Sequence, residues 1–189
     1  MSLDSIYLTG SSEKDRQTED FYPTPPYATL KLLEKETFIG SIYEPACGDG
    51  AISKILKDTD PKQKIYSTDI VDRGYGEKTN LDFLTYDFKN FKPNNIITNP
   101  PYNLAQQFIE RSLELSNDKV VMLLKLNFLA GQKRYKFFPE TPLKKVYIFS
   151  KRLSFDKGNE KGKGRGILEY AWYVWEQGYV GNPQIDWLL

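Results

Sequence analysis

The chain has 189 residues, of which 40% are hydrophobic and 14% aromatic, and its formal net charge at pH 7 is only +1. This length suits one domain with a substantial core, and the composition excludes a chain that is disordered throughout. The lack of histidine and the single cysteine, Cys47, exclude a Cys/His zinc site, a Ser–His or Cys–His nucleophile pair and an internal disulfide, and we expect no metal site.

A polar arm precedes the first predicted element. Residues 1–20 are charged and lack a sustained period, which predicts a flexible N-terminal arm, whereas residues 21–189 form a single domain. A helix is predicted over 26–36, with Thr24 as its N-cap and a proline in its first turn. The apolar face of this helix carries Tyr27, Leu30 and Leu33.

Strand and helix patterns then alternate along the chain. Runs of β-branched and aromatic residues predict strands at 41–45, 64–70, 81–84, 95–98, 120–126, 145–150 and 169–176. Apolar residues at helical spacing predict helices at 51–58, 103–116 and 130–137. The alternation predicts an α/β fold with a doubly wound, mostly parallel, seven-stranded sheet, in which the almost wholly apolar strand 120–126 is central.

The last two predicted strands are joined without a helix. Residues 156–166 form a Gly-rich basic loop between them. Strands 145–150 and 169–176 should therefore be antiparallel neighbours, so that the last strand runs against the others.

Basic residues are concentrated in one part of the chain. From Lys125 to Arg165 there are twelve Lys or Arg and three Asp or Glu, a local excess of +9 that leaves about −8 for the rest. A basic block beside an acidic body indicates a polyanionic partner, and a solvated charged face is the alternative. No apolar run has the length of a membrane span and the N-terminus is not signal-like, so a cytoplasmic protein without membrane contact is expected.

A Gly-x-Gly turn follows the first predicted strand. Gly48 and Gly50 allow a tight turn and close approach to a ligand, and Asp69 at the end of the next strand can bind ribose hydroxyls. Glu44, just before the turn, opposes a phosphate and favours a cationic or amine-bearing ligand. This pattern favours an adenosine that carries an amino acid over NAD or ATP. Alternatively, Glu44 and Asp49 cap the following helix.

The strand at 95–98 ends abruptly at Asn99-Pro100-Pro101-Tyr102. Two prolines stiffen the turn and keep it out of helical geometry. The turn therefore presents an amide and rigid carbonyls at the carboxyl edge of the sheet, where open α/β proteins bind ligands. Such acceptors suit an amino group, and Tyr102 offers a flat surface for a ring.

Both motifs resemble those of a known family. Glu44-Pro45-Ala46-Cys47-Gly48-Asp49-Gly50 looks like the S-adenosylmethionine motif of the amino-methyltransferases, and Asn99-Pro100-Pro101-Tyr102 is similar to their catalytic motif. Their order resembles the gamma arrangement of N6-adenine DNA methyltransferases. Further segments resemble small phage and prophage adenine methyltransferases that take part in DNA marking or restriction-modification, namely 21–27, 126–134, 152–155 and 170–175.

The resemblance implies a seven-stranded Rossmann-like methyltransferase fold with S-adenosylmethionine as cofactor. Within it, Glu44 would bind the methionine amino group, Asp69 the ribose, and Asp82 and Phe83 the adenine. The full implied cofactor set is Tyr22, Thr24, Pro25, Glu44, Pro45, Ala46, Gly48, Gly50, Asp69, Ile70, Asp82, Phe83 and Asn99, and the implied catalytic set is Asn99, Pro100, Pro101 and Tyr102.

The implied reaction is methyl transfer to N6 of an adenine flipped out of double-stranded DNA, by direct displacement. The expected nucleic-acid contacts are Lys133, Arg134, Lys151, Arg152, Phe155, Lys161, Lys163 and Arg165. An RNA base amine, a protein glutamine, and a catalytically silent nucleic-acid-binding domain are the alternatives. The larger gamma enzymes carry a separate target-recognition domain, which we do not expect here, and a monomer or weak dimer is expected.

Overall fold

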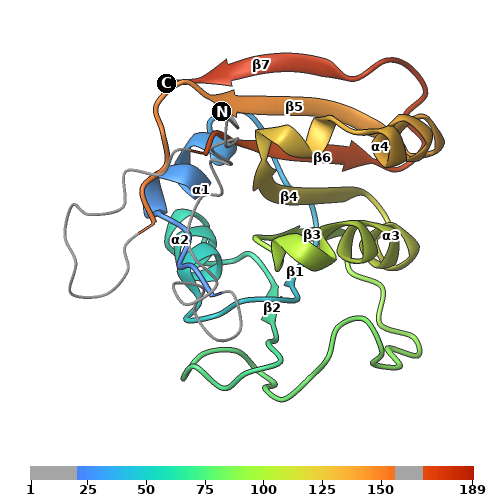
Figure 1. Ribbon diagram of the computed structural model, residues 1–189. Helices are drawn as coiled ribbons and strands as arrows, with labels where there is room; N and C mark the ends of the chain where they lie inside the picture. The colour runs from blue at the N-terminus through green and yellow to red at the C-terminus, as the bar shows by residue number, and fades with distance from the viewer. Residues whose placement is uncertain (1–20, 156–167) are drawn as a thin grey trace, which may run out of the picture.

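The computed structural model describes residues 21–155 and 168–189, so the predicted arm (1–20) and the whole predicted basic loop (156–166) lie outside the described residues. Seven strands form one sheet in the order β2-β1-β3-β4-β6-β5-β7, which runs from bottom to top in Figure 1. The strands are β1 (Ile42–Glu44), β2 (Ile65–Ser67), β3 (Asn95–Thr98), β4 (Lys119–Lys125), β5 (Leu143–Phe149), β6 (Tyr170–Glu176) and β7 (Gln184–Leu188).

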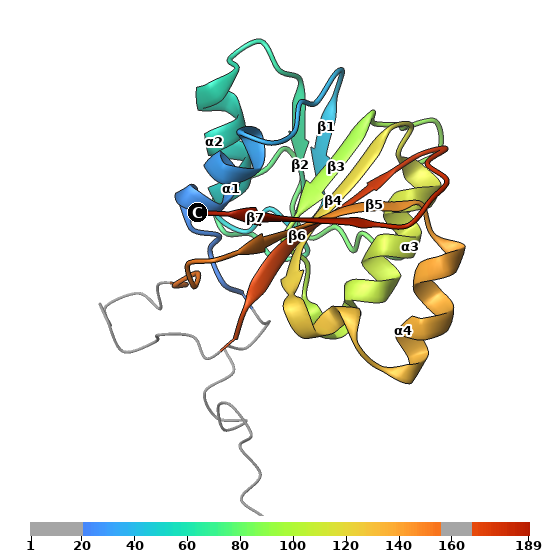
Figure 2. The ribbon, with the colours of Figure 1, turned by 90° about the horizontal axis from the view of Figure 1, so that it is seen from above.

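Helices cover both faces of the sheet (Figure 2). The α-helices are α1 (Pro26–Leu33), α2 (Ala51–Thr59), α3 (Ala105–Leu115) and α4 (Gln132–Phe137), with short 3₁₀ turns η2 (Tyr102–Leu104), η3 (Leu126–Leu129) and η4 (Phe138–Glu140). One buried cluster joins α1 and α2 to one face, and a second joins α3 and α4 to the other. The predicted doubly wound α/β architecture is confirmed. None of the described helices combines the length and apolar character that a membrane span requires.

The prediction of an antiparallel strand near the end of the chain is confirmed. Strand β6, predicted at 169–176, is antiparallel to both β4 and β5. A further strand, β7, follows and pairs with β5 in parallel. The sequence did not reveal β7 because four of its five side chains are exposed, which hides the apolar alternation of a buried strand.

The strand predicted at 81–84 is wrong. This segment belongs to a long loop in which Leu81 and Phe83 are buried against the core. Between them, Asp82 closes a turn, since its carboxylate accepts a hydrogen bond from the Leu84 amide at 2.9 Å. The apolar spacing therefore reflects a loop packed on the sheet.

The start of α1 also differs from the prediction. Pro25 occupies the N-cap position, and the predicted cap, Thr24, makes no capping hydrogen bond. Its hydroxyl instead accepts a hydrogen bond from the Asn99 amide at 3.1 Å. The helix buries Ala28 and Leu32, whereas Leu30, assigned to the apolar face, is 47% exposed.

The strand order positions the site. From β1 the sheet grows in one direction through β2 and in the other through β3 and β4. The segments that leave β1 and β3 therefore diverge to opposite faces and leave a crevice at the edge where these strands end, which we call the carboxyl edge. Both sequence motifs follow directly from these two strands.

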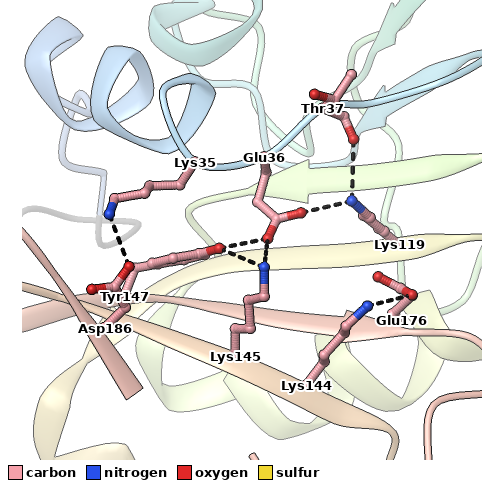
Figure 3. A network of polar contacts seen from close by, with 9 residues as sticks. All are labelled: Lys35, Glu36, Thr37, Lys119, Lys144, Lys145, Tyr147, Glu176 and Asp186. Carbon is pink, nitrogen blue, oxygen red and sulfur yellow. Dashed lines mark hydrogen bonds and ion pairs between the residues drawn. The ribbon is translucent and has the colours of Figure 1, made fainter. Parts of the chain in front are cut away.

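A buried carboxylate ties the elements together at the opposite edge of the sheet (Figure 3). Glu36, which follows α1, accepts hydrogen bonds from Lys119 on β4 at 2.6 Å, and from Tyr147 at 2.6 Å and Lys145 at 3.0 Å on β5. Burial on its own raises the pKa of Glu36, but these three donors outweigh it and leave the pKa below its ordinary value. Folding therefore favours the ionised form of the Glu36 carboxylate.

We expect Glu36→Gln to lower the free energy of unfolding at pH 7 by about 2–3 kcal/mol, because two ammonium groups lose a buried charged acceptor. The pKa of Glu36 is depressed in the folded state, so its contribution is present at neutral pH and is lost as the pH falls through that depressed pKa. Urea unfolding at pH 7 and at a series of progressively more acidic pH values measures both effects. Asp186→Asn is the matched control, since this exposed partner of Lys35 should matter little. Equal losses in the two variants would contradict the prediction.

Candidate active site

The turn between β1 and α2 depends on two glycines. Gly48 has φ +56° and Gly50 φ +81°, in the left-handed region that disfavours side chains. A Cβ at Gly48 would meet the ring of Phe21, and one at Gly50 the ring of Tyr75. Backbone and aromatic rings therefore approach each other as closely as glycine permits.

Glu44 ends β1 beneath this turn and is 1% exposed. Its Oε2 accepts hydrogen bonds from the amide of Ser53 at 3.0 Å and from the hydroxyl of the same residue. Glu44 therefore does cap α2, as the alternative interpretation proposed, and it also lines a cavity. The pKa of Glu44 is raised to about 8, mainly by burial; the Ser53 hydrogen bonds oppose this rise, and the charges of Asp69 and Asp49 add to it.

Asp69 fixes the glycine turn to the loop after β2. Its Oδ2 accepts a hydrogen bond from the amide of Gly48 at 2.7 Å, and its Oδ1 one from the amide of Val71 at 2.9 Å. The carboxylate is 7% exposed and lines the larger of two cavities. It is thus preorganised beside the turn, as a ribose ligand in that cavity would require.

Asn99 stands at the end of β3, between the two cavities, and lines both. Its Nδ2 donates to the carbonyl of Tyr22 at 3.3 Å and to the hydroxyl of Thr24 at 3.1 Å. Its Oδ1 is buried and has no hydrogen-bond partner among the described residues. The donors of the amide are used by the protein, while its acceptor is left for a ligand.

The cavities bring together most of the predicted cofactor residues. The larger one is lined by seven of them: Pro45, Ala46, Asp69, Ile70, Asp82, Phe83 and Asn99. The smaller one is lined by Tyr22, Thr24, Glu44, Ala46 and Asn99. The predicted residues Pro25, Gly48 and Gly50 shape the neighbouring backbone without lining either cavity, and Pro101 is the catalytic-motif proline that lines the larger one.

Sequence reasoning missed several lining residues. In the larger cavity these are Arg73, Leu81, Leu104 and Phe108, and in the smaller one Phe21, Pro23, Cys47, Asp49 and Ala51. Asp49 stands out because its Oδ1 is buried without a hydrogen-bond partner among the described residues. The smaller cavity is therefore more acidic than Glu44 alone suggests. The available signal was the acidic residue between the two glycines, which the sequence analysis took only as a helix cap.

An aromatic cluster borders the turn formed by Asn99–Tyr102. Ring centroids are 5.8 Å apart for Tyr102 and Tyr170, 4.9 Å for Tyr170 and Phe155, and 6.3 Å for Phe155 and Tyr22. These four residues, called the aromatic cluster below, connect Tyr102 back to the segment that holds Asn99. Phe155 thus packs as part of this cluster and contacts the core as well.

The predicted basic contacts have different surroundings. Lys133 and Lys151 are exposed, and Arg152 is exposed but paired with Glu169 at 3.0 Å. Arg134 is engaged within the protein: it donates to Gln106, and its guanidinium lies 4.0 Å from the centroid of the Phe128 ring. Lys161, Lys163 and Arg165 lie outside the described residues. Within the described ranges, no group of three Cys, Asp or Glu is placed to hold a metal ion.

No protein-family model and no curated protein matches the chain. Solved structures similar to it include a modification subunit of a candidate type I restriction enzyme from Vibrio vulnificus YJ016, with 10% identity, a TM-score of 0.62 and coverage of 87% of this chain and 45% of that one. A candidate RNA methyltransferase from Pyrococcus horikoshii has 14% identity and a TM-score of 0.55, and the match covers 82% of this chain and 84% of that one. The plantazolicin methyltransferase BpumL in complex with SAH has 10% identity and a TM-score of 0.50, and the match covers 80% of this chain and 81% of that one.

These likenesses establish the fold. The chain has the Rossmann-like α/β sheet of the methyltransferases, as predicted. It spans less than half the length of the Vibrio chain. At 10–14% identity these likenesses do not identify a substrate, so the substrate has to be inferred from this chain's own residues.

We expect Gly48→Ala to destabilise the fold by more than the about 1–2 kcal/mol that a left-handed alanine costs, because its Cβ also displaces Phe21. Gly178→Ala is the matched control: its φ is +79° but nothing lies within 4 Å of an added Cβ. Chemical unfolding of both variants measures the difference, and Phe21→Ala in the Gly48→Ala background should remove the excess. Equal costs at the two glycines would contradict the prediction.

Proposed function

We propose that the protein binds S-adenosylmethionine and transfers its methyl group to an amino nitrogen of a nucleic-acid base, namely N6 of adenine in DNA. The observation that carries this proposal is the Asn99 amide. Its nitrogen donates to Tyr22 and Thr24, and its oxygen is buried, lacks a hydrogen-bond partner in the described part of the chain and is set between two cavities. An oxygen held in this way is a preorganised acceptor for the N–H of an exocyclic amine.

The two cavities suit the two ends of the cofactor. The larger combines Asp69 and Asp82 with the ring of Phe83, which fits a ribose and an adenine. The smaller holds Glu44 and the unpartnered oxygen of Asp49, which fit an ammonium group. Bound S-adenosylmethionine would supply an electrophilic methyl group on a positive sulfur. The SAH complex of BpumL, a protein of similar fold, supports this cofactor.

The residues of the turn orient the acceptor amine. Asn99 Oδ1 and the carbonyl of Pro100 accept its two N–H groups, which draws the nitrogen towards tetrahedral geometry and exposes its lone pair. Bound S-adenosylmethionine would supply the methyl carbon and take back the electrons of its carbon–sulfur bond, while Asn99 and Pro100 would hold the lone pair of the amine towards that carbon and the amine would lose one proton to solvent. The chain supplies orientation and electrostatic complementarity, with no protein nucleophile. Burial raises the pKa of Cys47 far above its usual range, which disfavours a thiolate-based route.

A nucleic-acid base is the favoured carrier of the amine. The aromatic cluster beside Asn99 offers ring surfaces for a base that leaves its stack, and exposed Lys133 and Lys151 can meet phosphates. DNA is favoured because the Asn99–Tyr102 turn resembles the catalytic motif of N6-adenine DNA methyltransferases, and because the fold is similar to that of a modification subunit of a candidate type I restriction enzyme. RNA is the second candidate, supported by the fold likeness to a candidate RNA methyltransferase.

We expect Asn99→Ala to reduce methyl transfer by at least about 100-fold, the usual cost of removing one preorganised hydrogen-bonding group from an active site. Transfer of labelled methyl from S-adenosylmethionine to unmethylated DNA measures this, with an RNA of the same sequence as the second substrate. Calorimetry should show that the variant still binds the cofactor.

Asn103→Ala serves as the control for this experiment, because Asn103 is an exposed asparagine four residues further along the same turn. It should keep transfer within a few-fold of the unsubstituted protein. Transfer only to RNA would replace DNA by RNA as substrate. Cofactor binding without transfer to either nucleic acid, or no cofactor binding at all, would refute the proposal.

The raised pKa of Glu44 predicts a pH dependence of cofactor binding. Below about pH 8 the free protein holds this carboxyl neutral, and binding an ammonium group there requires its ionisation. The affinity for SAH should therefore rise by about tenfold per pH unit between pH 6 and pH 7. Calorimetry over this range measures the slope, and proton release can be read from buffers of different ionisation enthalpy.

Glu44→Gln provides the matched control, since it keeps the shape of the side chain and cannot ionise. It should bind SAH more weakly and remove the slope. A flat profile in the unsubstituted protein would show that Glu44 is already ionised or does not face the ligand.

A further inference from the structure

A lysine that the proposed chemistry does not use stands beside the catalytic turn. Lys125 is the last residue of β4, the strand next to β3 on the side away from β1. Its ammonium lies over the ring of Tyr102, 4.8 Å from the centroid. Across the sheet, Lys125 is in register with Tyr170, so it belongs to the same corner of the carboxyl edge as the aromatic cluster.

The ammonium of Lys125 has no carboxylate within ion-pair distance among residues 21–155 and 168–189. By contrast, Lys119 on β4 and Lys145 on β5, at the opposite edge of the sheet, both form ion pairs with Glu36. Lys125 is half-buried, and the one contact described for its ammonium is with the face of an aromatic ring. A half-buried cation in such a place favours the arrival of an anion.

The positive charge of the proposed cofactor would increase the need for an anion near Lys125. Its positive sulfur would be bound next to Asn99, and Lys125 adds a second positive charge beside the same turn. Like charges near one site oppose each other unless an anion joins them. A neutral amine substrate, such as a glutamine side chain, brings no such anion, whereas a nucleotide brings a phosphate attached to its base.

We propose that Lys125 binds the phosphodiester group of the nucleotide whose base enters the site, an inference that rests on the proposed function and specifies its substrate. In the free protein the ammonium covers the ring of Tyr102. On binding it moves from the ring to the phosphate, and the ring face becomes available for the base. One residue thereby couples recognition of the polyanion to the opening of the stacking surface.

The salt dependence of binding tests this inference, because each phosphate contact releases counterions and a packing role does not. The probe is a single-stranded oligothymidylate with one central adenine, bound in the presence of SAH. Lys125→Met retains the apolar stem and should lower the slope of log affinity against log salt by about 0.7. Lys125→Arg retains the charge and should keep the slope of the unsubstituted protein.

Lys62→Met is the matched control, since Lys62 is an exposed lysine in the loop before β2, at the opposite edge of the sheet. It should leave the slope unchanged. An unchanged slope in Lys125→Met, with SAH binding intact, would overturn the inference while the proposed function stands. If the unsubstituted protein binds SAH but no oligonucleotide, both the inference and the nucleic-acid part of the proposed function fail.

Discussion

The hydrogen bonds from the Asn99 amide to Tyr22 and Thr24 connect two parts of the site that lie 77 and 75 residues apart in the sequence. They join the end of β3 to the segment before α1, at 3.3 Å and 3.1 Å. That segment also places Phe21 against Gly48, so the Asn99–Tyr102 turn and the glycine turn share one wall. Because the nitrogen of Asn99 is held in this way, its oxygen remains without a hydrogen-bond partner among residues 21–155 and 168–189. The reversal of strand order between β1 and β3 brings the two turns close enough for one side chain to line both cavities.

Buried polar groups at the two edges of the sheet include one well-supplied carboxylate and two acceptors that face the candidate site. At the edge opposite the site, Glu36 is surrounded by three donors and stabilises the junction of α1, β4 and β5. At the carboxyl edge, Asn99 Oδ1 and Asp49 Oδ1 are buried without partners among the described residues. A buried unsatisfied acceptor costs about 1–3 kcal/mol. The fold therefore stores free energy at the carboxyl edge that a ligand with N–H donors can recover, while the Glu36 network holds the opposite edge.

Much of this architecture could be predicted from local patterns. Strand β3 was predicted at its observed bounds because all four of its residues are buried and a Pro-Pro pair ends it. The predicted cofactor contacts Glu44, at the end of β1, and Asp69, after β2, could be located because they flank a turn that requires glycine. Other features depend on contacts distant in sequence. Thr24 looks like a helix cap until Asn99 takes its hydroxyl, and Arg134 looks like a phosphate contact until Gln106 and Phe128 engage it. Strand β7 has too few buried residues to show a pattern, and its partner β5 defines it.

Negative and positive side chains lie on opposite sides of Asn99. The smaller cavity is acidic and buried, and the pKa of Glu44 is raised by that burial and by the neighbouring charges of Asp69 and Asp49. The corner beyond Tyr102 is aromatic and carries Lys125. A positively charged donor on one side and a polyanion on the other are therefore both complementary to the protein, and the acceptor oxygen of Asn99 lies between them. A reaction between these two partners needs no histidine, because the amine becomes nucleophilic through its hydrogen bonds and its lost proton can pass to solvent once the new bond has made it acidic.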